Sequence, residues 1–261
     1  MNDSQKKITL VIGLGEVGKP LLAVLQRHEP ETFGIDIAPV SIAGPIGFMH
    51  ICFPFKDPGQ FKDAVVAYAG KYAPDVIVIN STVAPGTTRA IEAACKITCV
   101  YSPVRGKHTK MADELCTYVK FVAGSNAQAT AQAMQQFRSA GMQSEAMSTP
   151  ESLELAKLLE TTYFGLLIAW AQEMNRFAQD VNADYTEVGR FFREIAYLPG
   201  VLFQPGYIGG HCVMPNIGLL QQQFQSDFLN TIKSSNDARA RELDTAEQQG
   251  PDNRLQPISL K

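Results

Sequence analysis

The chain lacks the features that mark several classes of protein. Its 5 cysteines are odd in number and form no CxxC pair, and its 4 histidines show no metal-ligand spacing. We therefore expect neither a disulfide framework nor a metal site, and a reducing cytoplasm fits best. No apolar run approaches the roughly 20 residues of a membrane span, and the polar start has no signal-peptide core, so no membrane partner is expected.

An excess of charge of one sign is also missing. The net charge is −3, which gives no electrostatic reason to expect nucleic acid or an anionic membrane surface as a partner. Hydrophobic residues make up 45% of the 261 residues, enough for one large or two modest globular domains. Because the net charge is small, any anionic ligand must be held by local geometry and not by the overall charge.

Residues 1–148 alternate short apolar runs with helical stretches, which is typical of a parallel sheet wrapped by helices. Strands are predicted at residues 8–12, 33–37, 48–53, 75–80, 98–101 and 118–123, and helices at 17–28, 60–72, 87–95 and 127–140. The connection between residues 36 and 48 is too short for a crossover helix, so the sheet should be trimmed at this edge. The pattern predicts an α/β fold with a Rossmann-type, doubly wound parallel sheet.

A second domain is predicted from residue 149. Thr149 suits an N-cap, Pro150 a first helical position and Glu151 a first turn. To about residue 181 this helix is apolar on most sides, so it should be buried by its own domain, by a partner subunit or by both. We predict an all-helical homodimerisation domain at residues 149–248, whose last helix runs over 217–248 and could be broken. A disordered tail should follow at residues 249–261.

A glycine-rich turn at residues 13–18 lies between a predicted strand and a predicted helix. Its first glycine permits the tight turn, its second lets a pyrophosphate approach backbone N–H groups, and its third lets helix and strand pack closely. Asp36, about twenty residues on, would bind the adenosine ribose diol and repel the 2′-phosphate of NADP. The motif predicts NAD as cofactor, and a structural turn with an incidental acid is the alternative. The predicted cofactor-binding residues are Gly13, Gly15, Glu16, Val17, Gly18, Asp36 and Thr82.

One cysteine lies in a second glycine-rich segment, Gly209-Gly210-His211-Cys212. Flanking glycines let a bulky substrate close on the sulfur, and a thiolate is a good acyl carrier, so Cys212 is a candidate nucleophile. The alternative is a small buried hydrophobe. Lys157 lies on the otherwise apolar helix, where an unpaired ammonium would be costly to bury, unless it snorkels to the surface.

Several segments together resemble the UDP-glucose/GDP-mannose dehydrogenase family. They are ITLVIGLGEVGKP (8–20), STVAPGTT (81–88), YSPVR (101–105), LAKLLETT (155–162) and PGYIGGHCVMP (205–215), in the family's order, and they cover the chain to about residue 240. The resemblance implies that a nucleotide sugar's primary alcohol is oxidised to a carboxylate in two NAD-dependent steps, through a cysteine thiohemiacetal and a thioester. It implies that Cys212 is the nucleophile and that Lys157 stabilises the oxyanion. It also implies that Thr82 helps hold the active-site water, for which a strand-end turn hydroxyl is the alternative.

Some positions depart from the family's pattern. Thr161 replaces an asparagine one helical turn after Lys157, and it can still offer a hydroxyl on the same face. Asn216 replaces an aspartate, and a neutral amide cannot act as a base. Val104 replaces a glutamate and can neither bind nor orient water. The candidate catalytic residues are therefore Cys212, Lys157, Thr161, Thr82 and Asn216, with part of the water-activating machinery missing.

The family continues into a third domain that grips the nucleotide, before which this chain stops. Either a separate polypeptide supplies that domain or the substrate differs. We weigh an active dehydrogenase with slow or absent thioester hydrolysis against a non-catalytic NAD-binding homologue that acts through its helical dimer face. The β-hydroxyacid dehydrogenase group shares the two-domain plan, but it does not need the Gly-Gly-His-Cys loop, which argues against it.

Overall fold

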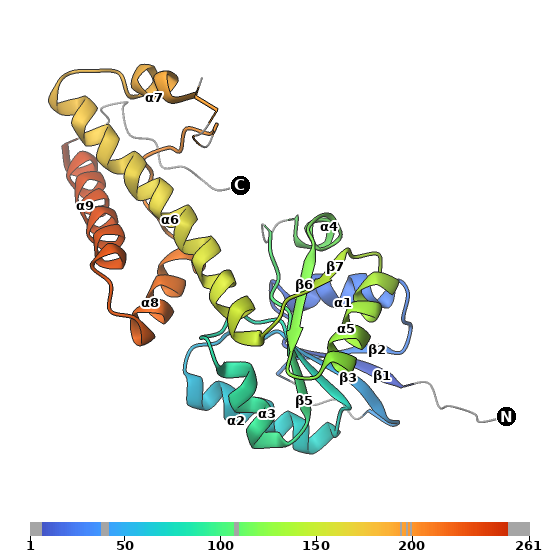
Figure 1. Ribbon diagram of the computed structural model, residues 1–261. Coiled ribbons are helices and arrows are strands. Elements are labelled where there is room, and N and C mark those ends of the chain that lie inside the picture. The colour runs from blue at the N-terminus through green and yellow to red at the C-terminus, as the bar shows by residue number, and fades with distance from the viewer. Residues whose placement is uncertain are drawn as a thin grey trace. The chain divides into compact units, whose positions relative to one another are not determined.

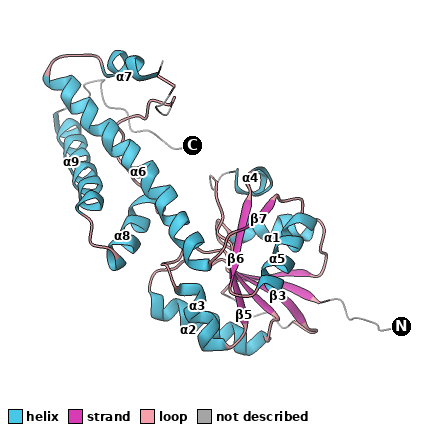
Figure 2. Cartoon of the chain, viewed as in Figure 1, coloured by secondary structure: helices cyan, strands magenta, loops and turns pink. Residues whose placement is uncertain are grey.

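The computed structural model describes residues 7–37, 42–106, 110–193, 195–196, 198 and 200–249. The chain forms two compact units, residues 1–157 (unit 1) and 158–261 (unit 2). Within the described residues, strands occur in unit 1 alone and unit 2 is helical (Figure 2). The predicted α/β domain followed by a helical domain is thus confirmed. The predicted domain limits at residues 148 and 248 stay a prediction, and residues 250–261 of the predicted tail lie outside the described residues.

Unit 1 is built on a seven-stranded sheet in the order β2-β1-β3-β4-β5-β6-β7 (Figure 1). The strands are β1 (Ile8–Ile12), β2 (Thr32–Ile35), β3 (Ile46–Ile51), β4 (Val76–Ile79), β5 (Thr98–Tyr101), β6 (Lys120–Gly124) and β7 (Ser144–Ala146). All neighbouring strands are parallel except β5 and β6, so the predicted parallel sheet is corrected to a mixed, mostly parallel one. After β5 the chain does not return to the edge of the sheet at which the parallel strands begin. β6 therefore runs in the opposite direction.

Helices cover both faces of this sheet. They are α1 (Gly18–Gln26), α2 (Pro58–Tyr72), α3 (Thr87–Cys95), α4 (Met111–Thr117) and α5 (Ala127–Ser139). Along β1, Leu10 and Ile12 join the core beneath α2 and α3, whereas Val11 joins the core beneath α1, α4 and α5. This alternation follows from the two-residue period of a strand. The sheet is therefore doubly wound, as predicted.

The edge beside β2 agrees with the short connection seen in the sequence. β1 pairs with β2 on one side and with β3 on the other, and no strand of the described chain lies beyond β2. Residues 38–41 of the connection lie outside the described residues. The expected trimming of the sheet is confirmed. The short elements α4 and β7 were not predicted, because 7 and 3 residues are too few for a clear period.

The helices that follow the sheet are α6 (Pro150–Asp180), α7 (Tyr185–Arg193), α8 (Val213–Gln223) and α9 (Asp227–Gln249). The Thr149 hydroxyl accepts a hydrogen bond from the Ser152 N–H at 3.1 Å, which confirms the predicted N-cap. The predicted last helix is in fact two helices, because Phe224 adopts an extended conformation and ends α8. None of the described helices is both long enough and apolar enough to cross a bilayer.

In unit 2, α6 is buried along one side only. Gly165 gives α8 and α9 room to approach, since a Cβ there would lie 2.5 Å from a Val213 methyl group. Its other side exposes large apolar side chains, namely Leu159, Tyr163, Trp170 and Phe177. The predicted burial of α6 on most sides is therefore not reached within a single copy of the chain.

Candidate active site

The glycine turn between β1 and α1 leaves an open backbone surface. Gly13 has a φ of +89°, and a Cβ there would lie 2.8 Å from the Phe53 nitrogen. A Cβ on Gly18 would lie 1.8 Å from the Gly13 carbonyl oxygen, so both positions require glycine. Gly15, in contrast, has no atom within 4 Å of its Cβ position. The loop is therefore tightly packed on its inner side and open where a ligand could approach its N–H groups.

The predicted cofactor-binding residues other than Thr82 lie together at this loop. Glu16 is exposed beside Gly15, and Val17 immediately precedes the first turn of α1. The carboxylate of Asp36, just after β2, accepts a hydrogen bond from the Leu14 N–H at 3.3 Å. An open glycine at a helix amino end suits a pyrophosphate, and a carboxylate at the end of β2 suits a ribose diol. The donor set thus fits a nicotinamide dinucleotide.

Thr82 lies at the same edge of the sheet, three residues beyond the carboxyl end of β4, and is half-buried. The segment that carries it is fixed by Glu154 of α6, which the sequence analysis missed. Its carboxylate accepts hydrogen bonds from the N–H groups of Gly86 (2.6 Å) and Thr88 (2.9 Å) and from the Thr88 hydroxyl. Burial raises the pKa of Glu154, while these hydrogen bonds act in the opposite direction.

A second missed residue is Lys120 of β6, which is 3% exposed. Its ammonium donates hydrogen bonds to Asn80 Oδ1 (3.1 Å), to the Pro103 carbonyl (3.1 Å) and to the Ser102 carbonyl. It therefore ties together the carboxyl ends of β4 and β5. The pKa of Lys120 is lowered to about 7, chiefly by burial and also by the charges of Lys157 and Arg105, against the opposing effect of Cys52.

The Lys120 bond continues into a buried polar chain through the sheet. Asn80 Nδ2 donates to His50 Nδ1 (3.2 Å), and His50 Nε2 bonds to Gln136 Oε1 (3.0 Å). Gln136 Nε2 then donates to Thr9 and Glu29, both at 2.9 Å. Because an amide nitrogen only donates, His50 carries its proton on Nε2 and is neutral. Burial lowers the pKa of His50 to about 3.

Lys157 and Thr161 lie one turn apart on α6, as predicted from their spacing. The Lys157 side chain is half-buried, so its exposure is intermediate between that of a buried catalytic group and that of a surface lysine. The charge of Lys157 lowers the pKa of Lys120, so the two ammonium groups lie in the same part of unit 1.

In unit 2, Cys212 is exposed and directly precedes α8. This exposure contradicts the alternative of a buried hydrophobe. The Asn216 N–H, one turn later, donates to the Cys212 carbonyl at 3.3 Å. Helix amino ends stabilise negative charge, which suits a thiolate at this place.

The residues that replace the family's asparagine and aspartate contact each other. Asn216 is 6% exposed and its Nδ2 donates to Thr161 Oγ1 at 2.9 Å, while that hydroxyl bonds to the Leu158 carbonyl at 3.0 Å. In unit 1, Val104 is buried in the core beneath α1 and α4. Neither Asn216 nor Val104 can take up a proton. Within the described residues, no group of three or more His, Cys, Asp or Glu side chains could hold a metal ion.

The chain thus combines a doubly wound sheet of the dinucleotide-binding type with a long helix after it and an exposed cysteine before α8. Residues 151–238 match the central domain of the UDP-glucose/GDP-mannose dehydrogenase family. The resemblance inferred from the sequence motifs is thereby confirmed.

Similar proteins support the same assignment. The UDP-N-acetyl-D-mannosamine dehydrogenase of Methanococcus vannielii is 22% identical, and the match covers 89% of this chain and 65% of that protein. The chain thus spans less than two thirds of this curated relative. The UDP-D-ManNAc dehydrogenase structure from Pyrococcus horikoshii has a TM-score of 0.78 at 18% identity, covering 92% of this chain and 70% of that one.

A fold of similar extent occurs in the 3-hydroxyisobutyrate dehydrogenase of Mycobacterium tuberculosis. Its TM-score is 0.70 at 14% identity, and the match covers 92% of this chain and 94% of that one. At this identity the likeness concerns the fold alone, so the two-domain plan is shared beyond the nucleotide-sugar enzymes.

Proposed function

We propose that this chain is an NAD-dependent oxidoreductase that acts on the primary alcohol of a nucleotide sugar. The observation that carries this proposal is the glycine loop, in which Gly15 is open at the amino end of α1 and Asp36 lies beside it. When bound there, NAD supplies the acceptor for hydride. The match of residues 151–238 to the family and the UDP-sugar dehydrogenases similar to this chain support the substrate class.

Cys212 is the proposed covalent nucleophile. After the alcohol has lost a hydride and a proton, the thiol adds to the aldehyde carbon and gives a thiohemiacetal. Loss of a second hydride from that carbon, and of the hydroxyl proton, gives a thioester on Cys212. The proposed roles of Lys157 and Thr82 are to stabilise the oxygen anion and to hold water, and Thr161 orients Asn216 through their hydrogen bond.

Hydrolysis of the thioester should be slow, because water needs a base and the two matching positions lack one. Asn216 is neutral and bonded to Thr161, and Val104 is buried in the core. The enzyme should therefore oxidise its substrate and then accumulate an acyl group on Cys212.

The test is a pre-steady-state assay with NAD and a panel of UDP- and GDP-sugars. We expect a burst of at most two NADH per chain, after which NADH formation almost stops. Mass spectrometry should then show the added mass of the acyl group on the peptide that carries Cys212. Cys212→Ser should form no adduct, whereas Cys116→Ser, a matched change in unit 1, should behave as wild type. Sustained turnover with two NADH per sugar and release of the free acid would contradict the impaired hydrolysis.

We also propose that a second copy of the chain covers the exposed side of α6. Tyr163, Trp170 and Phe177 repeat every seven residues there and are 54%, 53% and 56% exposed. Such a stripe is the pattern of a helix–helix seam. Light scattering after size exclusion should show a dimer for wild type and a monomer for Trp170→Glu, with Phe191→Glu on α7 as control. A wild-type monomer at every concentration would refute the seam.

The loss of both carboxylates favours a second candidate function, a non-catalytic NAD-binding homologue that acts through its dimer face. Val104 is buried in the core and Asn216 is hydrogen-bonded to Thr161, so neither position supplies a base. Under this candidate, Cys212→Ala retains every biological activity of the chain. Loss of activity in that variant would support the dehydrogenase instead.

A further inference from the structure

The main chain just before Cys212 is held by two buried side-chain amides. Gln172 of α6 donates from Nε2 to the Gly206 carbonyl at 2.6 Å. Asn236 of α9 accepts from the Ile208 N–H at 2.7 Å and donates from Nδ2 to the Ile208 carbonyl at 3.2 Å. Asn236 thus pairs with both polar groups of Ile208, as a neighbouring strand would.

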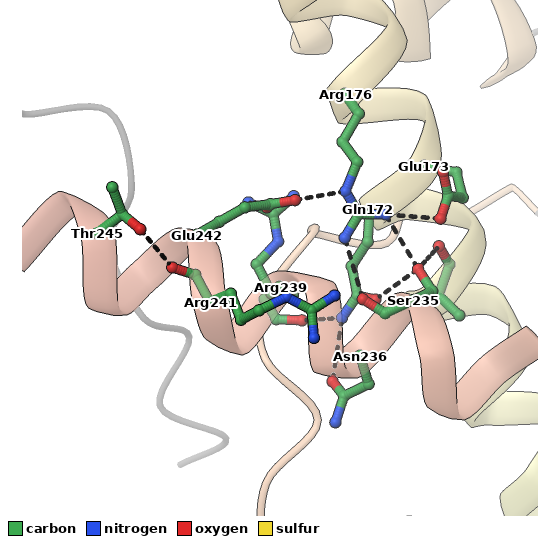
Figure 3. Close-up of polar contacts among 11 residues, drawn as sticks. Gln172, Glu173, Arg176, Ser235, Asn236, Arg239, Arg241, Glu242 and Thr245 are labelled. Carbon is green, nitrogen blue, oxygen red and sulfur yellow. Dashed lines mark hydrogen bonds and ion pairs between the residues drawn. The ribbon is translucent and has the colours of Figure 1, made fainter.

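Further polar side chains hold the Gln172 amide, which lies beside that of Asn236. The Ser235 hydroxyl donates to Gln172 Oε1 at 3.0 Å, and Arg176 donates from Nη1 to the same hydroxyl at 3.1 Å (Figure 3). Arg176 is itself fixed by Glu242, at 2.5 Å from Nε. Gln172 and Asn236 are 0% and 2% exposed, so their orientations are set by buried partners and not by solvent.

The distances show what the amides hold. Gln172 Nε2 lies 3.3 Å from Asn236 Oδ1, whereas the bonds to the Gly206 and Ile208 main chain are 2.6 and 2.7 Å. If the amides served only to join α6 to α9, their mutual bond would be the short one. Apolar side chains would join two helices with less desolvation of polar groups. The amides therefore serve the loop more than the helix pair.

The segment that carries Cys212 is short and lies between two buried anchors. Ile208 is 4% exposed and Val213, the first residue of α8, is 7% exposed. The residues between them, 209–212, are all exposed, and Gly210 has a φ of +77°. Fixing Ile208 therefore fixes one end of a four-residue span whose other end is the start of a helix.

We propose that Gln172 and Asn236 are positioning residues for Cys212, because their buried amides fix the main chain at Gly206 and Ile208 and so set where the exposed thiol lies. This inference rests on the proposed role of Cys212 as nucleophile. A displacement of about 1 Å at a reacting group can cost on the order of a hundredfold in rate. The Gln172 and Asn236 amides, called the clamp below, therefore affect the rate even though neither touches the substrate.

The test compares Asn236→Ala with the matched control Asn230→Ala on the same helix, where an exposed amide bonds to Gln221. In Asn236→Ala the Ile208 amide hydrogen should exchange at least about tenfold faster, because its acceptor is gone. Adduct formation at Cys212 should slow by about ten- to a hundredfold, while the affinity for NAD, whose proposed site is in unit 1, stays unchanged. Asn230→Ala should match wild type in all three measurements.

Conservative variants guard against simple loss of folding. Asn236→Asp keeps the acceptor for the Ile208 N–H, so it should restore the protection of that amide and most of the rate. Gln172→Glu keeps the acceptor for Ser235 but loses the donor to Gly206, so it should slow adduct formation in a folded protein. Wild-type rates in both Gln172→Glu and Asn236→Ala would overturn the proposal, as would unchanged exchange at Ile208 in Asn236→Ala.

Failure of the proposed function is visible separately, in wild type. If wild type forms no adduct with any sugar, the proposed chemistry fails, and alkylation of native Cys212 by iodoacetamide replaces adduct formation as the readout. A rate that differs from wild type in Asn236→Ala but not in Asn230→Ala supports the clamp. Equal rates in all three proteins overturn it.

Discussion

Lowering the pH from 7 to 4 should destabilise unit 1 by about 3 kcal/mol through His50. The folded chain holds this imidazole neutral and fully buried, with its pKa lowered from 6.5 to about 3. Between these values the unfolded chain binds one proton more than the folded chain. The free energy of unfolding therefore falls by about 1.4 kcal/mol per pH unit as acid is added, and the contribution is intact above pH 6.5.

The local contacts explain why the folded chain resists this proton. Protonation at Nδ1 would place an N–H against the Asn80 amide, whose oxygen is already bound to the Lys120 ammonium. Asn80 cannot reverse its amide without turning its nitrogen toward that ammonium. The Lys120 charge opposes the imidazolium as well.

Urea unfolding followed by circular dichroism between pH 7 and 4 measures the effect. His50→Leu should be less stable than wild type at pH 7 by about 1–3 kcal/mol, because Gln136 loses a partner, yet its stability should fall less steeply in acid. The difference in slope, about 1.4 kcal/mol per pH unit, belongs to His50 and is free of the carboxylates common to both proteins. His28→Leu, at an exposed position, should keep the wild-type slope. Equal slopes in His50→Leu and wild type would exclude His50 as a source of the acid dependence.

Three further predictions concern the cofactor loop and the segment behind it. Gly15→Ala should leave thermal stability unchanged but weaken NADH binding by about tenfold or more, whereas Gly18→Ala should destabilise the fold, because its Cβ would lie 1.8 Å from a carbonyl oxygen. Calorimetric titration and thermal melts of both variants separate the two effects, and equal melting points would contradict them. Asp36→Ser should reduce the preference for NADH over NADPH by about tenfold in the same titration, and an unchanged ratio would exclude Asp36 from the ribose site. Glu154→Ala should lower the free energy of urea unfolding by about 2–3 kcal/mol, since buried N–H donors lose their acceptor, and Glu154→Gln should lose less. A Glu154→Ala variant as stable as wild type would show that these hydrogen bonds do not stabilise unit 1.

Local periodicity was enough to predict the alternation of strands and helices in unit 1. The predicted helix at residues 87–95 coincides with α3, and the predicted N-cap at Thr149 is formed. The antiparallel direction of β6 could not be read in this way, because direction depends on where the chain returns and not on side-chain period. A break in the last helix was left open, but its place at Phe224 could not be predicted, since neither glycine nor proline marks it.

The site was predictable where backbone geometry dictates residue type. Gly13 and Gly18 fill positions that admit no side chain, so the motif carried its own structural meaning. Glu154 and Lys120 were missed because each acts on main-chain groups distant in sequence, and no local spacing reports such a bond. Asn236 was missed for the same reason, since its partner Ile208 lies 28 residues away.

The first measurement to make is a calorimetric titration of the purified chain with NADH and with NADPH. The account predicts binding of NADH that is clearly tighter than that of NADPH, because Asp36 accepts from a ribose diol and repels a 2′-phosphate. Binding of neither cofactor would contradict both the dehydrogenase and the non-catalytic NAD-binding function.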